Sequence, residues 1–261
     1  MATFEIIIPK SAKLQSEVKL RVEADSWIRA LKTGRQKVGE TEEITENYLC
    51  DIKEDNSIHV TDAGSGRVFR IVEIVPDQPP AVEAPIGRKL DLTSESTADF
   101  LEEVFELTQN VNQKRTQEEA LYFMLDLAID RIQVDSGSVF LADINQHDLY
   151  FGAARGPKAG DVMKFRVKMG QGIVGFCAEE GVGLAVSDVT KDSRFYAAIS
   201  EKIGYPTRSI LCVPMQMEGR IVGALELINK RGSDVFSERD LNIANFVAHQ
   251  LAEYLARQET I

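Results

Sequence analysis

The stretch of sequence that decides the fold is GYPTRSILCVPM, Gly204–Met215. Pro206 excludes a helix through its first half, because the proline ring fixes φ and removes a backbone hydrogen-bond donor. The apolar run at 210–215 predicts a strand that is buried on both faces. A threonine, an arginine and a serine (207–209) nevertheless lead directly into this strand. What these three hydrogen-bonding side chains contact is the first question that the sequence raises.

The sequence on both sides of this stretch alternates between strand and helix patterns. Five more strands are predicted, the last of them after a tight turn at Glu218-Gly219; they are 136–144, 148–156, 164–169, 183–188 and 220–230. A capping-box pattern at Thr116–Glu119 starts the second of five predicted helices, which are 97–112, 118–132, 170–181, 193–204 and 237–258. This order predicts one sheet of six strands with helices packed against it.

A proline-rich segment separates this region from the start of the chain. Residues 75–96 hold four of the eight prolines and show almost no apolar periodicity, which is typical of an extended linker. We place a first domain at 1–75, the linker at 76–96 and a second domain at 97–261. The first domain has the pattern β-β-α-β-β-β, which predicts a small α+β unit that binds a partner or dimerises.

The composition excludes several classes of function. The net charge of -11 disfavours binding to nucleic acid or to an anionic membrane. The chain has no signal-peptide pattern and no apolar stretch long enough for a membrane span, so we expect a cytoplasmic protein. Cys50, Cys177 and Cys212 are widely spaced. We therefore expect buried thiols rather than a disulfide framework, a metal site or a redox pair.

The sequence contains no familiar catalytic or metal-binding motif. GxSxG, the Walker phosphate loop and HExxH are all missing. The three histidines, at 59, 147 and 249, lie too far apart to predict a metal site. The glycine-rich stretch MGQGIVG, Met169–Gly175, follows a predicted strand and opens a predicted helix. Its amides could therefore face an anion, and the alternative interpretation is a tight turn that needs glycine.

Three segments, taken in order, resemble a GAF domain; they are QGIVG, AVSDVTKDSRFYAAISEKIGYPTRSILCVPM and GRIVGALELINKRGSDVFSERDL. The resemblance is strongest to the GAF domains of cyclic-nucleotide phosphodiesterases and of cyanobacterial adenylyl cyclases. It covers about residues 97–258 and none of the first domain. It implies an α+β fold with a six-stranded antiparallel sheet and flanking helices, and a role as a non-enzymatic sensor or dimerisation module.

The resemblance also implies a ligand pocket. Thr207 takes the place of a threonine that bonds the ligand, which offers an answer to the opening question. Ser138 takes the place of a serine that bonds the purine, and Glu226 that of an acid on a strand beside the pocket. Ile173 and Val174 take the places of two residues whose backbone amides meet the cyclic phosphate.

Several pocket positions depart from the family pattern. Ala154 replaces a stacking aromatic residue, and Arg155 replaces an aspartate that reads the base. Ser200 and Ile203 replace an aspartate and a threonine of the lid helix. Loss of a stacked ring weakens binding by roughly 1–3 kcal/mol, which argues against tight binding of cGMP or cAMP. Arg155 favours a more anionic ligand, and without ligand we expect it to pair with Glu226.

The family's N-K-F-D-E signature matches four residues of the chain, Asn229, Lys230, Phe236 and Asp240, while its last acid is Leu241 here. The resemblance implies that Lys230 and Asp240 pair outside the pocket with Phe236 buried beneath them. We interpret this group as a structural clamp on the terminal helix.

These observations predict a non-enzymatic regulatory signalling protein. A small ligand, such as a cyclic nucleotide or another small anionic molecule, would enter the pocket and order a lid at 192–204. The terminal helices and the first domain would pass the signal to a separate protein. The alternative is a ligand-free GAF scaffold for dimerisation and protein contacts. The reductases of free methionine sulfoxide are an enzymatic precedent among GAF domains, but their cysteines share a loop, whereas Cys177 and Cys212 are predicted on a helix and a strand.

The terminal helices also predict a homodimer. Both carry more apolar positions than one face of a sheet requires, and a helical bundle with a second copy would bury the excess. These positions are Phe100, Val104, Leu107 and Val111 in the first helix, and Leu241, Ala244, Val247, Ala248, Leu251 and Leu255 in the last.

Overall fold

The computed structural model describes residues 1–40, 48–52, 55, 57–62, 65–74, 116–192, 194–233 and 235–259. The chain forms two compact units, Met1–Asp91 and Leu92–Ile261, which we call the N-terminal and C-terminal units. The linker predicted at 76–96 and the helix predicted at 97–112 lie outside the described residues.

The N-terminal unit has the predicted order β-β-α-β-β-β. Its elements are β1 (Ala2–Ile8), β2 (Val18–Ala24), α1 (Trp27–Lys37), β3 (Tyr48–Ile52), β4 (Ile58–Asp62) and β5 (Arg67–Glu73). The strands pair antiparallel in the order β2-β1-β5-β4-β3. Alternate residues of β1 are buried, because successive side chains of a strand point to opposite faces of the sheet. Helix α1 contacts β1, β2 and β5 and covers the buried face.

Helix α1 begins and packs as its sequence dictates. Ser26 is its N-cap, and the Ser26 hydroxyl accepts a hydrogen bond from the Arg29 N–H. Trp27, Ile28 and Leu31 are buried. Gly34 lies on β1 so closely that a Cβ there would be 2.9 Å from Cδ1 of Ile6. This glycine therefore allows the close approach of α1 to the sheet, at the cost in helix propensity that glycine carries.

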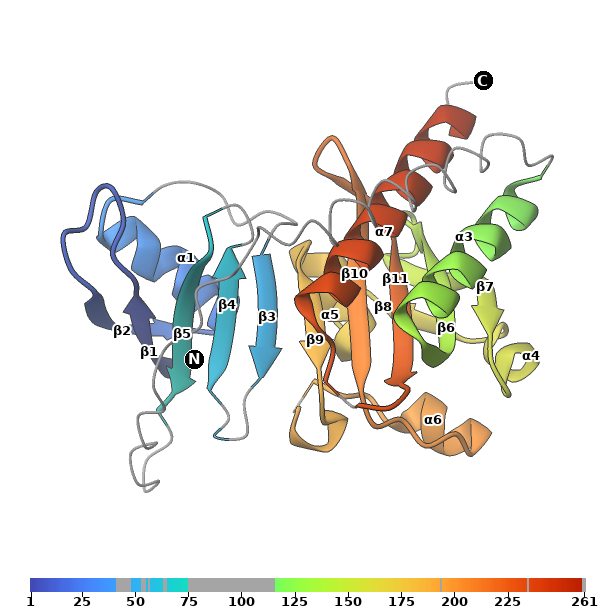
Figure 1. Ribbon diagram of the computed structural model, residues 1–261, viewed down its shortest axis with the longest axis horizontal. Helices are drawn as coiled ribbons and strands as arrows, with labels where there is room; N and C mark the ends of the chain where they lie inside the picture. Colours follow the sequence, from blue (N-terminus) through green and yellow to red (C-terminus); the bar gives the residue numbers. More distant parts are fainter. Residues whose placement is uncertain are drawn as a thin grey trace. The chain divides into compact units, whose positions relative to one another are not determined.

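The C-terminal unit is built on the predicted six-stranded antiparallel sheet (Figure 1). Its strands are β6 (Val134–Asp143), β7 (Asp148–Arg155), β8 (Arg166–Lys168), β9 (Gly183–Val186), β10 (Ile210–Met217) and β11 (Arg220–Lys230). They pair in the order β9-β10-β11-β6-β7-β8. Glu218 and Gly219 form the tight β10–β11 turn with φ of 50° and 77°. Positive φ at both central residues is what a two-residue hairpin turn needs.

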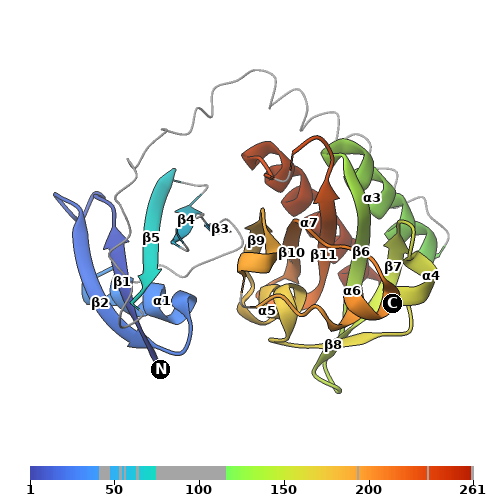
Figure 2. The same cartoon turned by 90° about the horizontal axis from the view of Figure 1, so that it is seen from below.

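Helices cover both faces of this sheet (Figure 2). The pair α3 (Gln117–Ile132) and α7 (Glu238–Glu259) packs on one face. The other face carries α5 (Gly172–Glu180) and the short helices α4 (Ala159–Val162) and α6 (Ala198–Ile203), and a 3-10 turn at Val189–Lys191 precedes α6. The capping box predicted for α3 is present, since Thr116 and Glu119 each accept a hydrogen bond from the other's backbone N–H.

The six apolar positions of α7 that suggested a dimer are buried within a single chain. The α7 residues from which we inferred an excess apolar face are buried by β10, β11 and α3; they are Leu241, Ala244, Val247, Ala248, Leu251 and Leu255. This burial removes the part of the dimer argument that rested on α7. The part that rested on 97–112 lies outside the described residues, so the homodimer stays a prediction.

Candidate functional site

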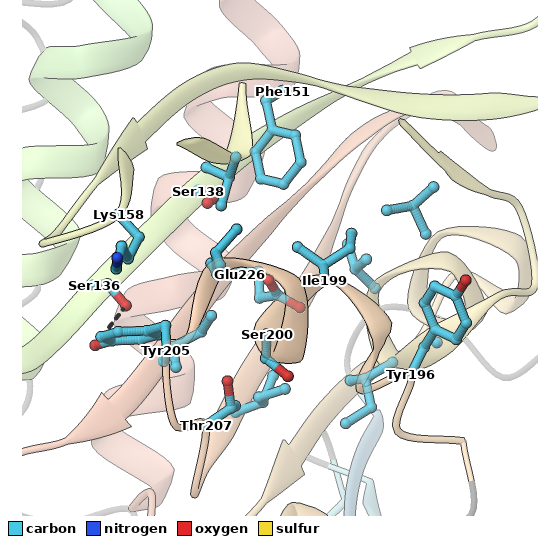
Figure 3. A pocket seen from close by; sticks show the side chains of 18 of the residues that line it. Ser136, Ser138, Phe151, Lys158, Tyr196, Ile199, Ser200, Tyr205, Thr207 and Glu226 are labelled. Carbon is cyan, nitrogen blue, oxygen red and sulfur yellow. Dashed lines mark hydrogen bonds between the residues drawn. The ribbon is translucent and has the colours of Figure 1, made fainter. Parts of the chain in front are cut away.

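A cavity lies on the face of the C-terminal sheet that α4, α5 and α6 cover (Figure 3). Its walls are mainly apolar side chains; they are Phe140, Phe151, Val162, Val167, Ile173, Val174, Phe195, Ile199, Ile203, Ile210 and Ile228. Its polar groups come from Ser136, Ser138, Arg155, Lys158, Gln171, Tyr196, Ser200, Tyr205, Thr207 and Glu226. Apolar walls with a few polar groups are typical of small-molecule sites.

The strands place polar side chains in the cavity floor through their two-residue period. Ser136, Ser138 and Phe140 alternate along β6 and all line the cavity. Glu226 of β11 pairs in register with Ser138. Directly opposed residues share a face of the sheet, so the Glu226 carboxyl and the Ser138 hydroxyl both face the cavity. Eight of the nine predicted ligand-binding residues line it.

Helix α5 turns its N-terminus toward the cavity. Gly172 has φ of 70°, in the left-handed region that glycine adopts readily. Gln171 supplies no side-chain cap and the first turn has no acidic residue. The first N–H groups of a helix have no acceptor within it. The backbone N–H groups of Ile173 and Val174 therefore offer hydrogen bonds to an anion, as we inferred from the family resemblance.

The three polar residues before β10 have three different environments. Thr207 lines the cavity. The exposed Arg208 side chain lies 3.8 Å from Asp135. Ser209 is buried, and its hydroxyl accepts a hydrogen bond of 3.2 Å from the Lys230 N–H. β10 is thus a core strand. Of the three residues that lead into it, 207–209, which we call its entry segment, only Thr207 borders the cavity.

Asn229 holds this entry segment in place. It is buried and has φ of 59°. Its side-chain oxygen accepts a hydrogen bond of 2.7 Å from the Arg208 N–H, and its amide nitrogen donates one of 2.9 Å to the Pro206 carbonyl. The family signature groups Asn229 with the clamp on the terminal helix. The structure instead gives it the role of fixing the backbone on both sides of Thr207.

The rest of the signature forms the predicted clamp. The Lys230 ammonium pairs with the Asp240 carboxylate, and the same carboxylate accepts hydrogen bonds from the N–H and hydroxyl of Ser237 at 2.6 and 2.8 Å. Phe236 is buried, with its ring centre 5.8 Å from the Lys230 nitrogen. Because Ser237 caps the Asp240 N–H, this group joins the end of β11 to the start of α7, outside the cavity.

The expected pairing of Arg155 with Glu226 is wrong. Arg155 binds Asp126 of α3 with two hydrogen bonds of 2.6 and 3.0 Å, and its guanidinium lies 4.1 Å from the ring centre of Tyr122. The hydrogen bonds that Arg155 donates to the Asp126 carboxylate raise the pKa of Arg155. Arg155 borders the cavity, but its charge is satisfied outside it.

A β-bulge explains this outcome. Phe140 pairs with Phe151 but Val139 pairs with Ala153, so Gly152 has no partner in the ladder. In a regular strand 151, 153 and 155 would share a face. The extra residue changes that parity, so that Ala154 stands opposite Ser138 on the cavity side and Arg155 stands opposite Gly137 on the α3 side. The Ala154 methyl group is buried and does not reach the lining.

The lid residues approach the cavity from α6. Ser200 and Ile203 both line it, and Gly204 ends the helix in a left-handed conformation. The Ser200 hydroxyl donates a 2.8 Å hydrogen bond to the Ala197 carbonyl. Its oxygen can still accept a hydrogen bond, whereas its proton is used inside the helix.

Glu226 differs from the other charged residues of the cavity in its electrostatic environment. Among the described residues its carboxyl has no hydrogen-bond or ion-pair partner, and burial raises its pKa to about 7. The side chain is only half-buried by surface area, because the cavity gives water access to an otherwise enclosed carboxyl. An ionisable group that is enclosed, unpaired and inside a cavity is a candidate ligand contact.

We expect Glu226→Gln to make the ligand-free protein more stable at pH 8 by about 2 kcal/mol. Because the pKa of Glu226 is raised from 4.5 to about 7 in the folded protein, the unfolded chain loses the carboxyl proton at a lower pH than the folded one. Folded stability therefore falls as pH rises through this window, and the penalty is complete above pH 7. At about 1.4 kcal/mol per pKa unit the ceiling is about 3 kcal/mol, which cavity water lowers.

The test is denaturant unfolding of both proteins at pH 5 and pH 8, followed by the near-ultraviolet circular dichroism of tyrosine. Five of the six tyrosines lie in the C-terminal unit. The stability difference between variant and wild type should grow with pH. Glu201→Gln, which alters an exposed carboxyl of α6, should show no such growth. A constant difference at both pH values would refute the assignment.

Sequence reasoning missed five polar lining residues, which are Ser136, Lys158, Gln171, Tyr196 and Tyr205. The sequence did indicate Ser136, because it lies two residues before Ser138 on the same strand and therefore on the same face. The other four lie in connecting segments, where no periodicity indicates the direction of a side chain.

The described part of the chain also bears on the cysteine, metal and membrane expectations. The thiols of Cys50, Cys177 and Cys212 are free and buried, and burial together with a hydrogen bond to Cys177 raises the pKa of Cys212. Within the described ranges no group of three or more histidine, cysteine, aspartate or glutamate residues is arranged to hold a metal ion. No helix among those residues is long and apolar enough to span a bilayer.

Comparisons with known proteins agree with this architecture. A family model described as GAF domain matches residues 117–255. The probable 3',5'-cyclic phosphodiesterase pde-5 of Caenorhabditis elegans is 29% identical over 126 residues, which is 45% of this chain and 17% of that protein. The dual 3',5'-cyclic-AMP and -GMP phosphodiesterase 11A of Takifugu rubripes is 40% identical over 77 residues, which is 29% of this chain and 8% of that protein.

Solved structures show the same fold. The GAF domain of a phosphoenolpyruvate-protein phosphotransferase from Coxiella burnetii superimposes with a TM-score of 0.58 and 21% sequence identity, covering 64% of this chain and 98% of that one. The chain spans less than a fifth of the length of the two curated relatives above.

Proposed function

Because the chain belongs to the GAF domain family, we propose that it is a non-enzymatic regulatory protein whose cavity binds a small anionic ligand with a hydrogen-bonding ring. A cyclic nucleotide is the first candidate. The relatives named above are phosphodiesterases of cyclic nucleotides, but their catalytic activity is a property of much longer chains.

The observation that carries this proposal is the Glu226 carboxyl at the cavity floor, which has no hydrogen-bond or ion-pair partner in the described part of the chain. A protein that used this domain only as a scaffold would gain stability by replacing that residue with an apolar one. The groups around it form a complementary set. The α5 amides suit a phosphate, the Ser138 and Thr207 hydroxyls suit a ring or sugar, and Glu226 accepts a hydrogen bond from a ring N–H.

Ligand binding would act through the lid and the helices. Residues 192–204 lie between β9 and the entry segment of β10, so closure over a ligand moves the backbone that Asn229 holds beside Thr207. The same end of β11 also carries Lys230, which pairs with Asp240 of α7. We propose that α7 and the N-terminal unit carry the signal to a separate protein, with a homodimer as the signalling form.

The alternative role as a ligand-free scaffold receives one supporting observation. Ala154 stands where the family pattern has a stacking aromatic residue and does not reach the cavity, so no aromatic side chain at that position holds a base. We also propose that the domain has no thiol chemistry of its own. The raised pKa of the buried Cys212 thiol supports this, because the thiolate is the reactive form.

The test is isothermal titration of the full chain with cGMP, cAMP and cyclic dinucleotides. We expect one of the cyclic mononucleotides to bind with a Kd well below about 1 mM, the weak end of the affinity scale. Glu226→Ala should weaken that binding at least about tenfold while the protein stays folded, since removing a buried acceptor leaves the ring N–H unpaired. Glu201→Ala, on the exposed side of α6, is the matched control.

Absence of binding by all these ligands at millimolar concentration would favour the scaffold role. Binding that Glu226→Ala leaves unchanged would retain the sensor but remove Glu226 from its site.

A further inference from the structure

One corner of the cavity gathers hydrogen-bond donors. Ser136, Tyr205 and Lys158 all line this corner, and Figure 3 shows the Lys158 ammonium directed toward the hydroxyl groups of the other two. The Ser136 hydroxyl lies 3.2 Å from the Tyr205 hydroxyl. We call these three residues the donor corner.

Backbone geometry fixes this corner. Gly156 follows β7 with φ of 120°, and a Cβ there would lie 2.4 Å from the Cβ of Ser136. Only glycine can therefore pass over Ser136, and this close passage brings Lys158 to the cavity two residues later. On the other side, the Tyr205 N–H bonds the Ser200 carbonyl at 2.9 Å, which fixes Tyr205 directly after the lid helix.

The hydrogen bonds within the corner leave protons directed at the cavity. The Tyr205 oxygen accepts from the Ser136 hydroxyl at 3.2 Å and from the Asn229 amide nitrogen at 3.5 Å. With both acceptor positions of that oxygen engaged, the Tyr205 O–H proton is available to a ligand. Lys158 has an ion pair with Asp161 at 3.9 Å, between side chains that are 40% and 55% exposed. Such an exposed pair holds the ammonium only weakly.

The donor corner and Glu226 together present a defined hydrogen-bonding pattern. The corner offers an ammonium and a phenol, both of which donate, whereas Glu226 accepts when ionised. An oxo-purine matches this pattern, because it carries a carbonyl oxygen at C6, an acceptor at N7 and a donor N–H at N1. An adenine places an amino donor at C6 and has no proton at N1. An adenine would place its amino donor against the donors of the corner. It would also offer no N1–H proton for the Glu226 carboxylate to accept.

We propose that Lys158, supported by Tyr205, is the specificity determinant that selects an oxo-purine nucleotide over an adenine nucleotide. This inference rests on the proposed function, since it requires the α5 amides to hold the phosphate and the ring to lie toward the donor corner. In Figure 3 the donor corner and Tyr196 lie at opposite sides of the pocket. Tyr196 marks the α5 end, because its Cβ lies 3.2 Å from where a Cβ of Gly172 would be.

The experiment compares cGMP, cyclic inosine monophosphate and cAMP on the full chain by isothermal titration. Cyclic inosine monophosphate keeps the C6 oxygen and the N1 proton of cGMP but lacks its amino group. We expect the wild type to bind both oxo-purines at least about tenfold more tightly than cAMP. Lys158→Met should weaken both oxo-purines about tenfold and leave cAMP within about twofold. Tyr205→Phe should have a smaller effect in the same direction.

Lys164→Met is the matched control, since it removes an equal charge from an exposed residue just beyond α4 that does not line the cavity. It should leave all three affinities unchanged. If Lys158→Met weakens the three nucleotides equally, Lys158 is a general anion contact and the inference fails while the proposed function stands. If the wild type binds cAMP more tightly than the two oxo-purines, the inference likewise fails and the proposed function stands. If none of the three binds, both the inference and the cyclic-nucleotide function fail.

Discussion

Replacement of Glu40 by alanine is expected to lower the free energy of unfolding of the N-terminal unit by about 3–5 kcal/mol. Glu40 is buried and pairs with two arginines from different elements: Arg67 of β5 at 2.9 Å and Arg35 of α1 at 3.4 Å. The two guanidinium groups lie 4.9 and 5.4 Å from the ring centre of Phe69. Without Glu40, the two neighbouring guanidinium groups would lose the carboxylate that binds them both.

The pKa of Glu40 agrees with this arrangement. Burial by itself raises that pKa, but hydrogen bonds from Arg67, Ser11 and Arg35 outweigh burial and hold it below its usual range. A depressed pKa means that the contribution is present above the unfolded value of about 4.5 and is lost as pH falls through the folded value. The deficit of Glu40→Ala should accordingly be largest near neutral pH and shrink in acid.

The single tryptophan makes this prediction easy to measure. Trp27 is buried in α1, so its fluorescence during urea unfolding of the full chain reports on the N-terminal unit. Asp25→Ala is the matched control, because it removes a carboxylate whose pair with Arg29 is exposed on both sides. It should change stability by less than about 1 kcal/mol. Equal losses for Glu40→Ala and Asp25→Ala would show that the buried cluster contributes nothing particular.

Replacement of Asp240 by alanine is expected to destabilise the C-terminal unit by about 3 kcal/mol. One carboxylate oxygen receives the Lys230 ammonium and both hydrogen bonds from Ser237. The side chains of Lys230 and Asp240 are 16% and 7% exposed. Alanine would leave a largely buried ammonium unpaired and would free the first turn of α7 from β11.

Tyrosine circular dichroism in urea follows this unit and should reveal the loss. Asp240→Asn keeps an oxygen that can accept from Ser237 but removes the charge, so we expect about half the effect. Arg257→Ala, which breaks an exposed pair with Glu253 on the same helix, should lie within about 0.5 kcal/mol of wild type. If Asp240→Ala unfolded at the same urea concentration as Arg257→Ala, the clamp would have no structural role.

The sequence by itself determined most elements of both units, although it did not predict α4, and the helix predicted at 193–204 begins at Ala198. The six strands of the C-terminal sheet, the capping box at Thr116 and the turn at Glu218-Gly219 all follow from residues within about four positions of one another. The Lys230–Asp240 pair and eight of the nine pocket residues came from matching an ordered family pattern. Periodicity alone would not have found them, because it gives the face of a strand and not what lies against it.

Only the tertiary structure decided which groups meet. A single extra residue at Gly152 directed the Arg155 guanidinium to Asp126, although Arg155 still borders the cavity, and left Glu226 without a hydrogen-bond or ion-pair partner among the described residues. The side-chain period of a strand is two, so a shift of one residue exchanges its faces, and no local pattern in β7 announced that shift. The donor corner likewise joins distant segments, because Ser136 bonds Tyr205 about seventy residues away and Gly156 passes closely over Ser136 before Lys158. Contacts of this kind depend on register and packing between distant segments, which the order of residues in one segment does not specify.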